Sequence, residues 1–563
     1  MQGMGKIVSV CLIVFAGLLV WADGGAGGGG AKGTTVRLPG AAFNALETIN
    51  PEHIRWHVRF LSHDLLEGRG TGQRGGDLAA EYIATQFAEY GLKPAGDHGT
   101  YMQRVPLVGI TTLPDSQFSL IPKKKGEAMN LRALDEYVAY DQTQQPQSDV
   151  DAEVVFVGYG IEAPEYNWDD YKGVDVRGKI LLMLVNEPTS DDPKFFKGKS
   201  LTYYGRWTYK YEEGLRKGAA GVLLVHQTQM ASYPWEVVRN SNSGEKSFLK
   251  LEGPALKVAS WIHFDVASRL ASASGMSLEK LMASAQSRDF RPVSLGARLK
   301  AHMVSKVRNF ESNNVLAILP GGDRKMADEA VMYTAHWDHF GIRPDLPGDN
   351  IFNGADDNAT GCGILLEVAR AFGTSAAKPR RSILFAAVTA EEQGLLGSEY
   401  LGKHPPIPAG KITLDLNYDD VKPLGAPEEV QVAGAERTNF YPIVQAMAKD
   451  FRLAIRPDAR PEAGHFYRSD HFSLARVGIP SFSINEGTKF KGHADSWGVQ
   501  QESDYVDKHY HQPSDEYRPD MDFVGDSAMA RFGFALGWEA AGLSKLIEWQ
   551  KGDEFEAARI KNH

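Results

Sequence analysis

The sequence predicts an α/β fold in which a mixed sheet flanked by helices is interrupted by a β-rich insertion. Three observations support this prediction. After about residue 302, short apolar strands alternate with amphipathic helices, which is typical of α/β proteins. Residues 149–301 read mostly as strands separated by glycine turns. The chain has 563 residues, which is enough for more than one domain.

The N-terminus has the pattern of an export signal. Lys6 precedes an apolar run over residues 7–20, which has the length of a signal peptide and is short for a membrane span. Ala22 is a small residue suited to a cleavage point. We therefore expect residues 1–22 to be a signal peptide of a periplasmic or secreted protein, with a retained membrane anchor as the alternative. Residues 23–45 are glycine-rich and predict a linker.

Composition narrows the classes of partner. The formal net charge is -10, and no long run of lysine and arginine occurs, which disfavours nucleic acid or an anionic membrane as a main partner. No further segment is apolar enough to span a membrane, so no stable membrane partner is expected. Cys11 lies in the predicted signal, which leaves Cys362 alone in the mature chain. Its apolar surroundings favour a buried hydrophobic role over a nucleophilic one.

The predicted domain limits follow from changes in the helix and strand patterns along the sequence. Residues 46–148 are predicted to form the first part of the main domain, with helices on both sides of a glycine-rich turn that begins at Glu67. The insertion covers residues 149–301. The expected elements within it are strands at 153–160, 176–185 and 221–225 and a helix at 204–217.

The last part of the main domain is predicted at residues 302–545, with a C-terminal tail at 546–563. Its expected strands are 331–335, 382–388 and 412–418, and its expected helices are 361–372 and 394–403. Acidic and histidine side chains follow these strands where each strand ends. The clusters are His336 with Asp338 and His339, Asp356 with Asp357, Glu391 with Glu392, Asp419 with Asp420, and, much later, His511 with Asp515.

Sites in α/β sheets gather at the carboxyl ends of the strands, so we expect these clusters to meet. Carboxylates that meet without compensation repel each other, and a divalent cation removes that repulsion. Mixed histidine and carboxylate ligands suit zinc, and the number of ligands suffices for two metal ions. The neighbouring side chains of Glu391 and Glu392 diverge, so one of them is free for proton transfer.

These motifs resemble peptidase family M28, the co-catalytic zinc aminopeptidases and their relatives. The motifs that carry the resemblance are AHWDH at 335–339, GADDNATG at 354–361, AEEQGLLGS at 390–398, NYD at 417–419 and YHQPSD at 510–515. The resemblance covers residues 51–148 and 308–542 and implies a mixed-sheet zinc-peptidase fold. The insertion is similar to a protease-associated (PA) domain, on the motifs GYGI at 158–161, DVRGKI at 175–180 and KGAAGV at 217–222.

The resemblance implies a role for each ligand. Asp357 should bridge two Zn²⁺ ions, since it takes the position before the NATG turn, which makes Asp356 a poor candidate. Glu392 and His511 should complete one metal site. His336 and Asp419 should complete the other.

The remaining roles are also implied by the resemblance. Glu391 resembles the general base. Asp338 is placed to orient His336, and Asp515 to do likewise near His511. Tyr510 stands where relatives use a tyrosine to stabilise the oxyanion, with a packed aromatic as the alternative.

Two positions stay open in the sequence. Asp420, and more weakly Asp415, compete with Asp419 as the ligand. Ser469, Asp470 and His471 recur in relatives as a group that lines the substrate pocket. Contiguous Ser, Asp and His side chains cannot by themselves form a catalytic triad.

The resemblance thus implies an exported zinc aminopeptidase that acts on peptides with a free N-terminus. A carboxypeptidase-like relative is an alternative, which needs basic residues for a terminal carboxylate; Arg206 and Arg216 are candidates. A glutaminyl-cyclase-like relative is another. A non-catalytic binding protein on the same scaffold, as in the transferrin receptor, is a third.

Overall fold

The computed structural model describes residues 38–123, 127–231, 233–344 and 346–562. The predicted signal peptide, residues 1–22, and most of the predicted linker lie outside the described residues. Within that linker range, helix α1 (Gly40–Glu47) begins at Gly40. Among the described residues, no helix combines the length and apolarity that crossing a membrane requires.

The main sheet has a parallel centre. Strands β17 (Ser382–Val388), β14 (Ala330–His336), β18 (Ile412–Asn417) and β21 (Ser481–Ser483) run parallel to one another in that order. The first three coincide closely with the predicted strands. Beyond β17 the sheet continues through antiparallel strand β13 (Val293–Leu319), which makes it mixed, as predicted.

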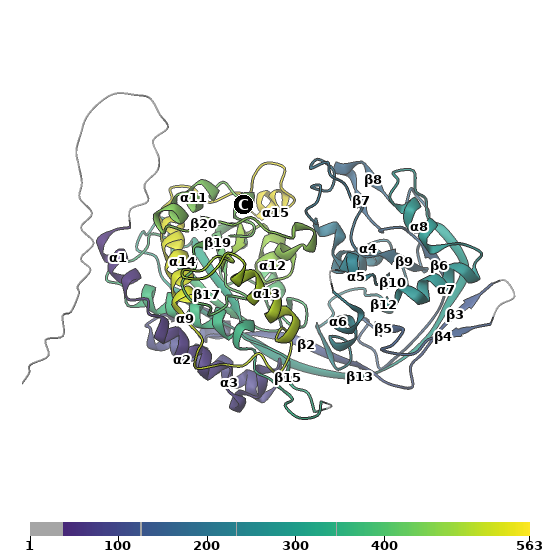
Figure 1. Cartoon of the computed structure of the whole chain (residues 1–563), viewed down its shortest axis with the longest axis horizontal. Helices are drawn as coiled ribbons and strands as arrows, with labels where there is room; N and C mark the ends of the chain where they lie inside the picture. Colours follow the sequence, from purple (N-terminus) through teal and green to yellow (C-terminus); the bar gives the residue numbers. More distant parts are fainter. Residues whose placement is uncertain (1–37, 124–126, 232, 345, 563) are drawn as a thin grey trace, which may run out of the picture. The chain divides into compact units, whose positions relative to one another are not determined.

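Both faces of this sheet are covered. In β14, the side chains of Val331, Tyr333 and Ala335 belong to a core that includes α2 (Pro51–Leu61), α3 (Arg74–Glu89), α9 (Thr360–Gly373) and α14 (Val524–Gly542). Ala330 and Met332 belong to a core on the opposite face, with α10 (Leu396–Lys403) and α12 (His471–Arg476). Successive side chains of a strand point to opposite faces of the sheet. Because both faces are buried, the parallel strands read as continuous apolar runs. Figure 1 shows α2, α3, α9, α12 and α14 around the sheet.

The insert has its own sheet. Strands β6 (Gln147–Phe156), β9 (Ile180–Leu184), β10 (Gly221–Val225) and β12 (Val258–Ile262) are parallel neighbours, and β5 (Tyr137–Tyr140) pairs antiparallel with β12. Helix α4 (Trp207–Arg216) lies in the range predicted for a helix. The likeness of this region to a PA domain, and the domain boundaries, stay predictions.

One strand belongs to both sheets. The N-terminal half of β13 pairs with β3 (Gln117–Pro122) and β6 in the insert sheet, and its C-terminal half pairs with β2 (Met102–Thr112) and β17 in the main sheet. Figure 1 shows β13 as one long strand. Strand β2 in turn pairs with β11 (Lys246–Leu249), so a short strand from the insert forms an edge of the main sheet.

Candidate metal centre

The ends of the parallel strands bring the predicted ligands together. His336 is the last residue of β14, Glu391 and Glu392 follow β17, and Asp419 follows β18. Asp357 lies in the turn before α9, and His511 follows α13 (Trp497–Lys508). Because β14, β17 and β18 are parallel, their carboxyl ends lie at one edge of the sheet, as expected.

The first group of ligand atoms surrounds His336. Its Nε2 lies 3.3 Å from Asp357 Oδ1 and 3.2 Å from Asp419 Oδ1. Zinc bonds of about 2.0–2.1 Å in a tetrahedron place neighbouring ligand atoms about 3.3–3.4 Å apart. The observed spacings match that edge, so these three side chains fit one zinc ion.

A second group uses the other oxygen of Asp357. His511 Nε2 lies 3.3 Å from Asp357 Oδ2 and 3.3 Å from Glu392 Oε2, again the tetrahedral edge. The two oxygens of Asp357 therefore face two different groups. This is the arrangement that a carboxylate shared by two metal ions requires.

Repulsion at the site supports the same fit. Burial, together with the charge of the neighbouring Glu392, raises the pKa of Glu391 well above its usual range. Burial and the charge of Asp357 raise the pKa of Glu392 in the same way. Buried carboxylates in contact are costly unless a cation neutralises them, so the donor set and its charge both fit zinc.

The structure distinguishes the aspartates that the sequence left open. Asp419 faces His336, whereas Asp420 forms an ion pair with Lys422 at 2.7 Å. Asp415 is buried and accepts a hydrogen bond from Thr334 Oγ1 at 3.0 Å, beneath the cluster. The geometry therefore favours Asp419 as the ligand.

Asp338 supports two functional residues rather than one. His336 donates from Nδ1 to the main-chain oxygen of Asp338 at 3.2 Å, which leaves Nε2 free to face the metal group. The Asp338 carboxylate accepts from the main-chain N–H of Glu391 at 3.0 Å and from Thr71 Oγ1 at 2.9 Å. Its carboxylate thus holds the Glu391 backbone, and only its carbonyl orients the histidine.

Asp515 differs from its expected role. Its carboxylate accepts from the main-chain N–H groups of Asp356 and Asp357 at 3.0 and 3.1 Å, so it fixes the bridging residue instead of orienting His511. The reason is the fold of the chain after His511, which turns Asp515 beneath the loop before α9; its carbonyl also accepts from Ala355 N–H.

The Ser469, Asp470 and His471 group lies beneath Asp419. Ser469 donates from Oγ to Asp419 Oδ2 and accepts from Asn417 Nδ2 at 2.8 Å. Asp470 and His471 are 0% and 2% exposed. These three residues were expected to line the substrate pocket, but in the structure they are buried and support the predicted ligand Asp419.

Tyr510 covers the second group. Its ring stacks on the His511 ring with centroids 3.8 Å apart, and the residue is 42% exposed. A phenol that stays protonated remains a hydrogen-bond donor near the metal centre. The structure is therefore compatible with the oxyanion role and with aromatic packing.

Three functional candidates were missed or left without a role in the sequence. His339 is fully buried, and its Nδ1 lies 2.6 Å from Glu392 Oε1; with Asp357 and Glu392 it forms a second possible ligand set. Arg69 is buried and donates to the carbonyl oxygens of Trp337 and Gly354, at 2.7 and 2.9 Å, next to the ligand loops. The AHWDH motif was a usable signal for His339. Arg69, and Lys246 described below, could not be identified from the sequence, because their roles depend on tertiary contacts.

Cys362 is buried, as expected for a structural thiol. Its Sγ–H donates to the carbonyl oxygen of His336 at 3.1 Å. Burial raises the pKa of the thiol to about 12, which keeps it protonated and unreactive.

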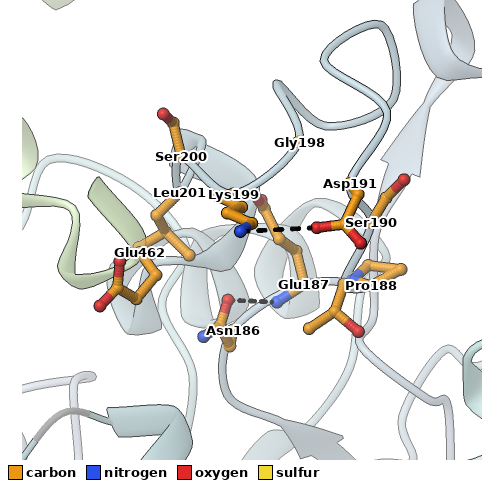
Figure 2. Close-up of a pocket in the computed structure, with 11 residues that line it drawn as sticks. Asn186, Glu187, Pro188, Ser190, Asp191, Gly198, Lys199, Ser200, Leu201 and Glu462 are labelled. Carbon is orange, nitrogen blue, oxygen red and sulfur yellow. Dashed lines mark hydrogen bonds and ion pairs between the residues drawn. The ribbon is translucent and has the colours of Figure 1, made fainter. Parts of the chain in front are cut away.

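A separate cavity of about 350 Å³ is lined mostly by residues of the insert (Figure 2). Residues 186–191 and 198–201 line it together with Glu462. Lys199 Nζ lies 3.8 Å from Asp191 Oδ1 there, and Asn186 Oδ1 accepts from Glu187 N–H at 2.8 Å. None of the predicted ligands lines this cavity, so the chemistry lies elsewhere.

Comparisons with known proteins agree with this geometry. Residues 314–531 match the sequence model of Peptidase family M28, and this segment holds every predicted ligand. The fold and the site together define a metal-dependent hydrolase of the α/β class. The segment that holds every predicted ligand is thus similar to peptidase family M28.

Individual relatives cover less of the chain. Leupeptin-inactivating enzyme 1 of Streptomyces exfoliatus is 26% identical over 249 residues, which are 43% of this chain and 51% of that protein. Aminopeptidase NAALADL1 of Rattus norvegicus is 33% identical over 131 residues, 22% of this chain and 16% of that protein. The matches thus span about half or less of these curated relatives.

A solved structure shows the same fold over a wider range. The aminopeptidase from Aneurinibacillus sp. strain AM-1 has a TM-score of 0.50 and 19% sequence identity, and the match covers 91% of this chain and 98% of that chain.

Proposed function

We propose that the chain is an exported zinc aminopeptidase that removes N-terminal residues from peptides. The observation that carries the proposal is the pair of oxygens of Asp357, which face two ligand groups at tetrahedral spacing. His336 and Asp419 would hold one ion, and Glu392 and His511 the other. Zinc bound there would supply a Lewis acid and a water of lowered pKa.

The side chains of the protein perform the proton transfers. Glu391 is held by its backbone against Asp338, directly before the predicted ligand Glu392, where its carboxylate can serve as the general base. It takes a proton from the attacking water and passes it to the leaving amine. Tyr510 donates a hydrogen bond to the oxyanion.

The structure gives no support to the two arginines, Arg206 and Arg216, that the sequence offered as a carboxylate site for a carboxypeptidase. Arg216 forms ion pairs with Glu213 and Glu212 at 2.7 and 3.6 Å. Arg206 is buried in the insert, and the nearby charge of Arg468 lowers its pKa further after burial has lowered it. Neither arginine belongs to the ligand groups, so neither supports recognition of a terminal carboxylate there.

The test uses aminoacyl p-nitroanilides with a free or an acetylated amine. Cleavage restricted to the free-amine series, abolished by a chelator and restored by zinc, supports the proposal. Cleavage of the acetylated series at equal rates contradicts it. Export is tested separately by the N-terminal sequence of the protein recovered outside the cytoplasm, where a retained Met1 counts against a cleaved signal.

Glu391→Gln checks the assignment of the base. The amide cannot accept the proton, so kcat should fall by about 10²–10⁴-fold, while the zinc content measured by atomic emission stays at the wild-type value. Ser503→Ala, an exposed hydroxyl on α13, serves as a control with wild-type turnover. Near-normal kcat in Glu391→Gln would show that another group moves the proton.

A further inference from the structure

A lysine from the insert lies beside the catalytic glutamates. Lys246 is the first residue of β11, the short strand that pairs with β2 at the edge of the main sheet, with Lys246 opposite Ile110. Although β11 lies within the insert range of the sequence, it is thus part of the sheet that carries the metal centre.

The residues around Lys246 fix this strand against the loop of the general base. Ser247 donates from its main-chain N–H to Gln393 Oε1 at 3.1 Å, and Gln393 directly follows Glu392. Leu249 packs with Ala390 and Leu396, on both sides of the glutamate pair.

The residue before Lys246 is anchored as well. Glu245 forms an ion pair with Arg308 of β13, with Nη2 2.6 Å from Oε1. Residues 245, 247 and 249 are therefore all held by neighbouring segments, which sets the position from which the Lys246 side chain extends.

The ammonium of Lys246 interacts with the acidic cluster. Burial lowers the pKa of Lys246 to about 8, and the carboxylates of Glu392 and Glu391 oppose this change. In the part of the chain that the structure describes, the ion pairs within 4 Å include none for Lys246, and the residue is partly buried. Its charge is close to the site and available.

We propose that Lys246 binds a carboxylate on the leaving side of the substrate, so that the enzyme prefers short peptides with a free C-terminus or an acidic residue after the scissile bond. The inference rests on the proposed aminopeptidase function. A flexible lysine binds carboxylate as a point charge, and Lys246 begins the short strand that lies against the loop of Glu391 and Glu392.

The experiment compares four substrates in the full chain. Leu-Gly and its amide differ only in the terminal carboxylate, and Leu-Asp-amide and Leu-Asn-amide differ only in the side-chain carboxylate. The variants are Lys246→Met, which keeps the length without the charge, and Lys246→Arg, which keeps the charge. Lys250→Met is the matched control, since Lys250 is exposed on the same segment.

The preference for each carboxylate is the ratio of the two kcat/KM values. A charge-assisted hydrogen bond predicts that Lys246→Met lowers one or both ratios by about 10- to 100-fold, that Lys246→Arg restores most of it, and that Lys250→Met leaves it unchanged. The pair whose ratio falls identifies the source of the carboxylate. Ratios that Lys246→Met leaves unchanged in both pairs overturn the proposal.

Binding separates this proposal from the proposed function. In the Glu391→Gln background with zinc bound, calorimetry measures the dissociation constants of Leu-Gly and Leu-Gly-amide, and of the Asp and Asn amides. Loss of the carboxylate preference on adding Lys246→Met supports the proposal even if turnover is absent, and an unchanged preference overturns it. Failure to cleave any free-amine substrate in the wild type contradicts the aminopeptidase function alone.

Discussion

Asp357 shows at the scale of one residue how the site is built. Its main-chain N–H is held by Asp515, and its two oxygens point to different histidines. Through the resemblance to peptidase family M28, its sequence position before the NATG turn predicts it as the bridging residue. The contact with Asp515 could not be predicted, because it depends on how the chain folds back after α13.

His339 gives a prediction at the same scale. It is fully buried beside Glu392 Oε1, while Glu392 Oε2 faces His511. We expect His339→Gln to weaken zinc binding by about 10- to 100-fold, as loss of a partner behind a ligand does. Competition with a chromogenic chelator measures the affinity.

The control for His339 is His302→Gln, an exposed histidine in the insert sheet that pairs with Asp149. It should bind zinc as the wild type does. Equal affinities for zinc in His339→Gln and the wild type would mean that His339 neither ligates the metal nor orients Glu392.

Among the elements, the parallel strands were the most predictable part of the fold. Strands β14, β17 and β18 are buried on both faces, so each reads as an unbroken apolar run. The burial of β13 alternates over residues 295–305 but not over the rest of the strand, and its pairing partners are far away in sequence. The sequence pattern therefore did not reveal it, nor the edge position of β11.

The packing of α2 against α3 predicts a pH dependence. His57 in α2 lies 2.9 Å from the Tyr82 hydroxyl of α3 and 3.2 Å from the Tyr90 hydroxyl. Burial, with the charges of His53 and Arg370, lowers the pKa of His57 from 6.5 to about 4. The folded state therefore holds this histidine neutral where the unfolded state binds a proton.

The sign of the effect follows from this difference. Between pH 6.5 and about 4 the unfolded state binds more protons at His57. The contribution of neutral His57 to the free energy of unfolding is complete above pH 6.5 and is lost as the pH falls toward 4. The loss amounts to at most about 3 kcal/mol. Urea unfolding of the wild type and of His57→Gln at several pH values measures it. If both proteins lose stability with the same slope across this window, His57 does not titrate as stated.

At the scale of the whole molecule, the metal centre joins segments that are distant in sequence. Its ligands span residues 336 to 511, so metal binding stabilises the folded state over the unfolded one. Removing zinc should lower the melting temperature, and zinc at about 1,000 times its Kd should restore about 4 kcal/mol. Calorimetry with a chelator and added zinc measures this.

The matched control is Asp357→Asn, which removes one charge from the residue that both groups share. Its melting temperature should respond much less to zinc. A wild type whose melting temperature is the same with and without the chelator would show that the acidic cluster does not hold a metal that matters for folding.

Strand β13 has a consequence for how such a protein can change over evolution. Its two halves pair with different sheets, so at its C-terminal end the insert is joined to the rest of the chain inside a strand rather than through a loop. Recombination that exchanged the insert would have to join the pieces in register, because a slip of one residue turns every following side chain to the other face. The insert can therefore vary by substitution far more easily than by replacement as a module.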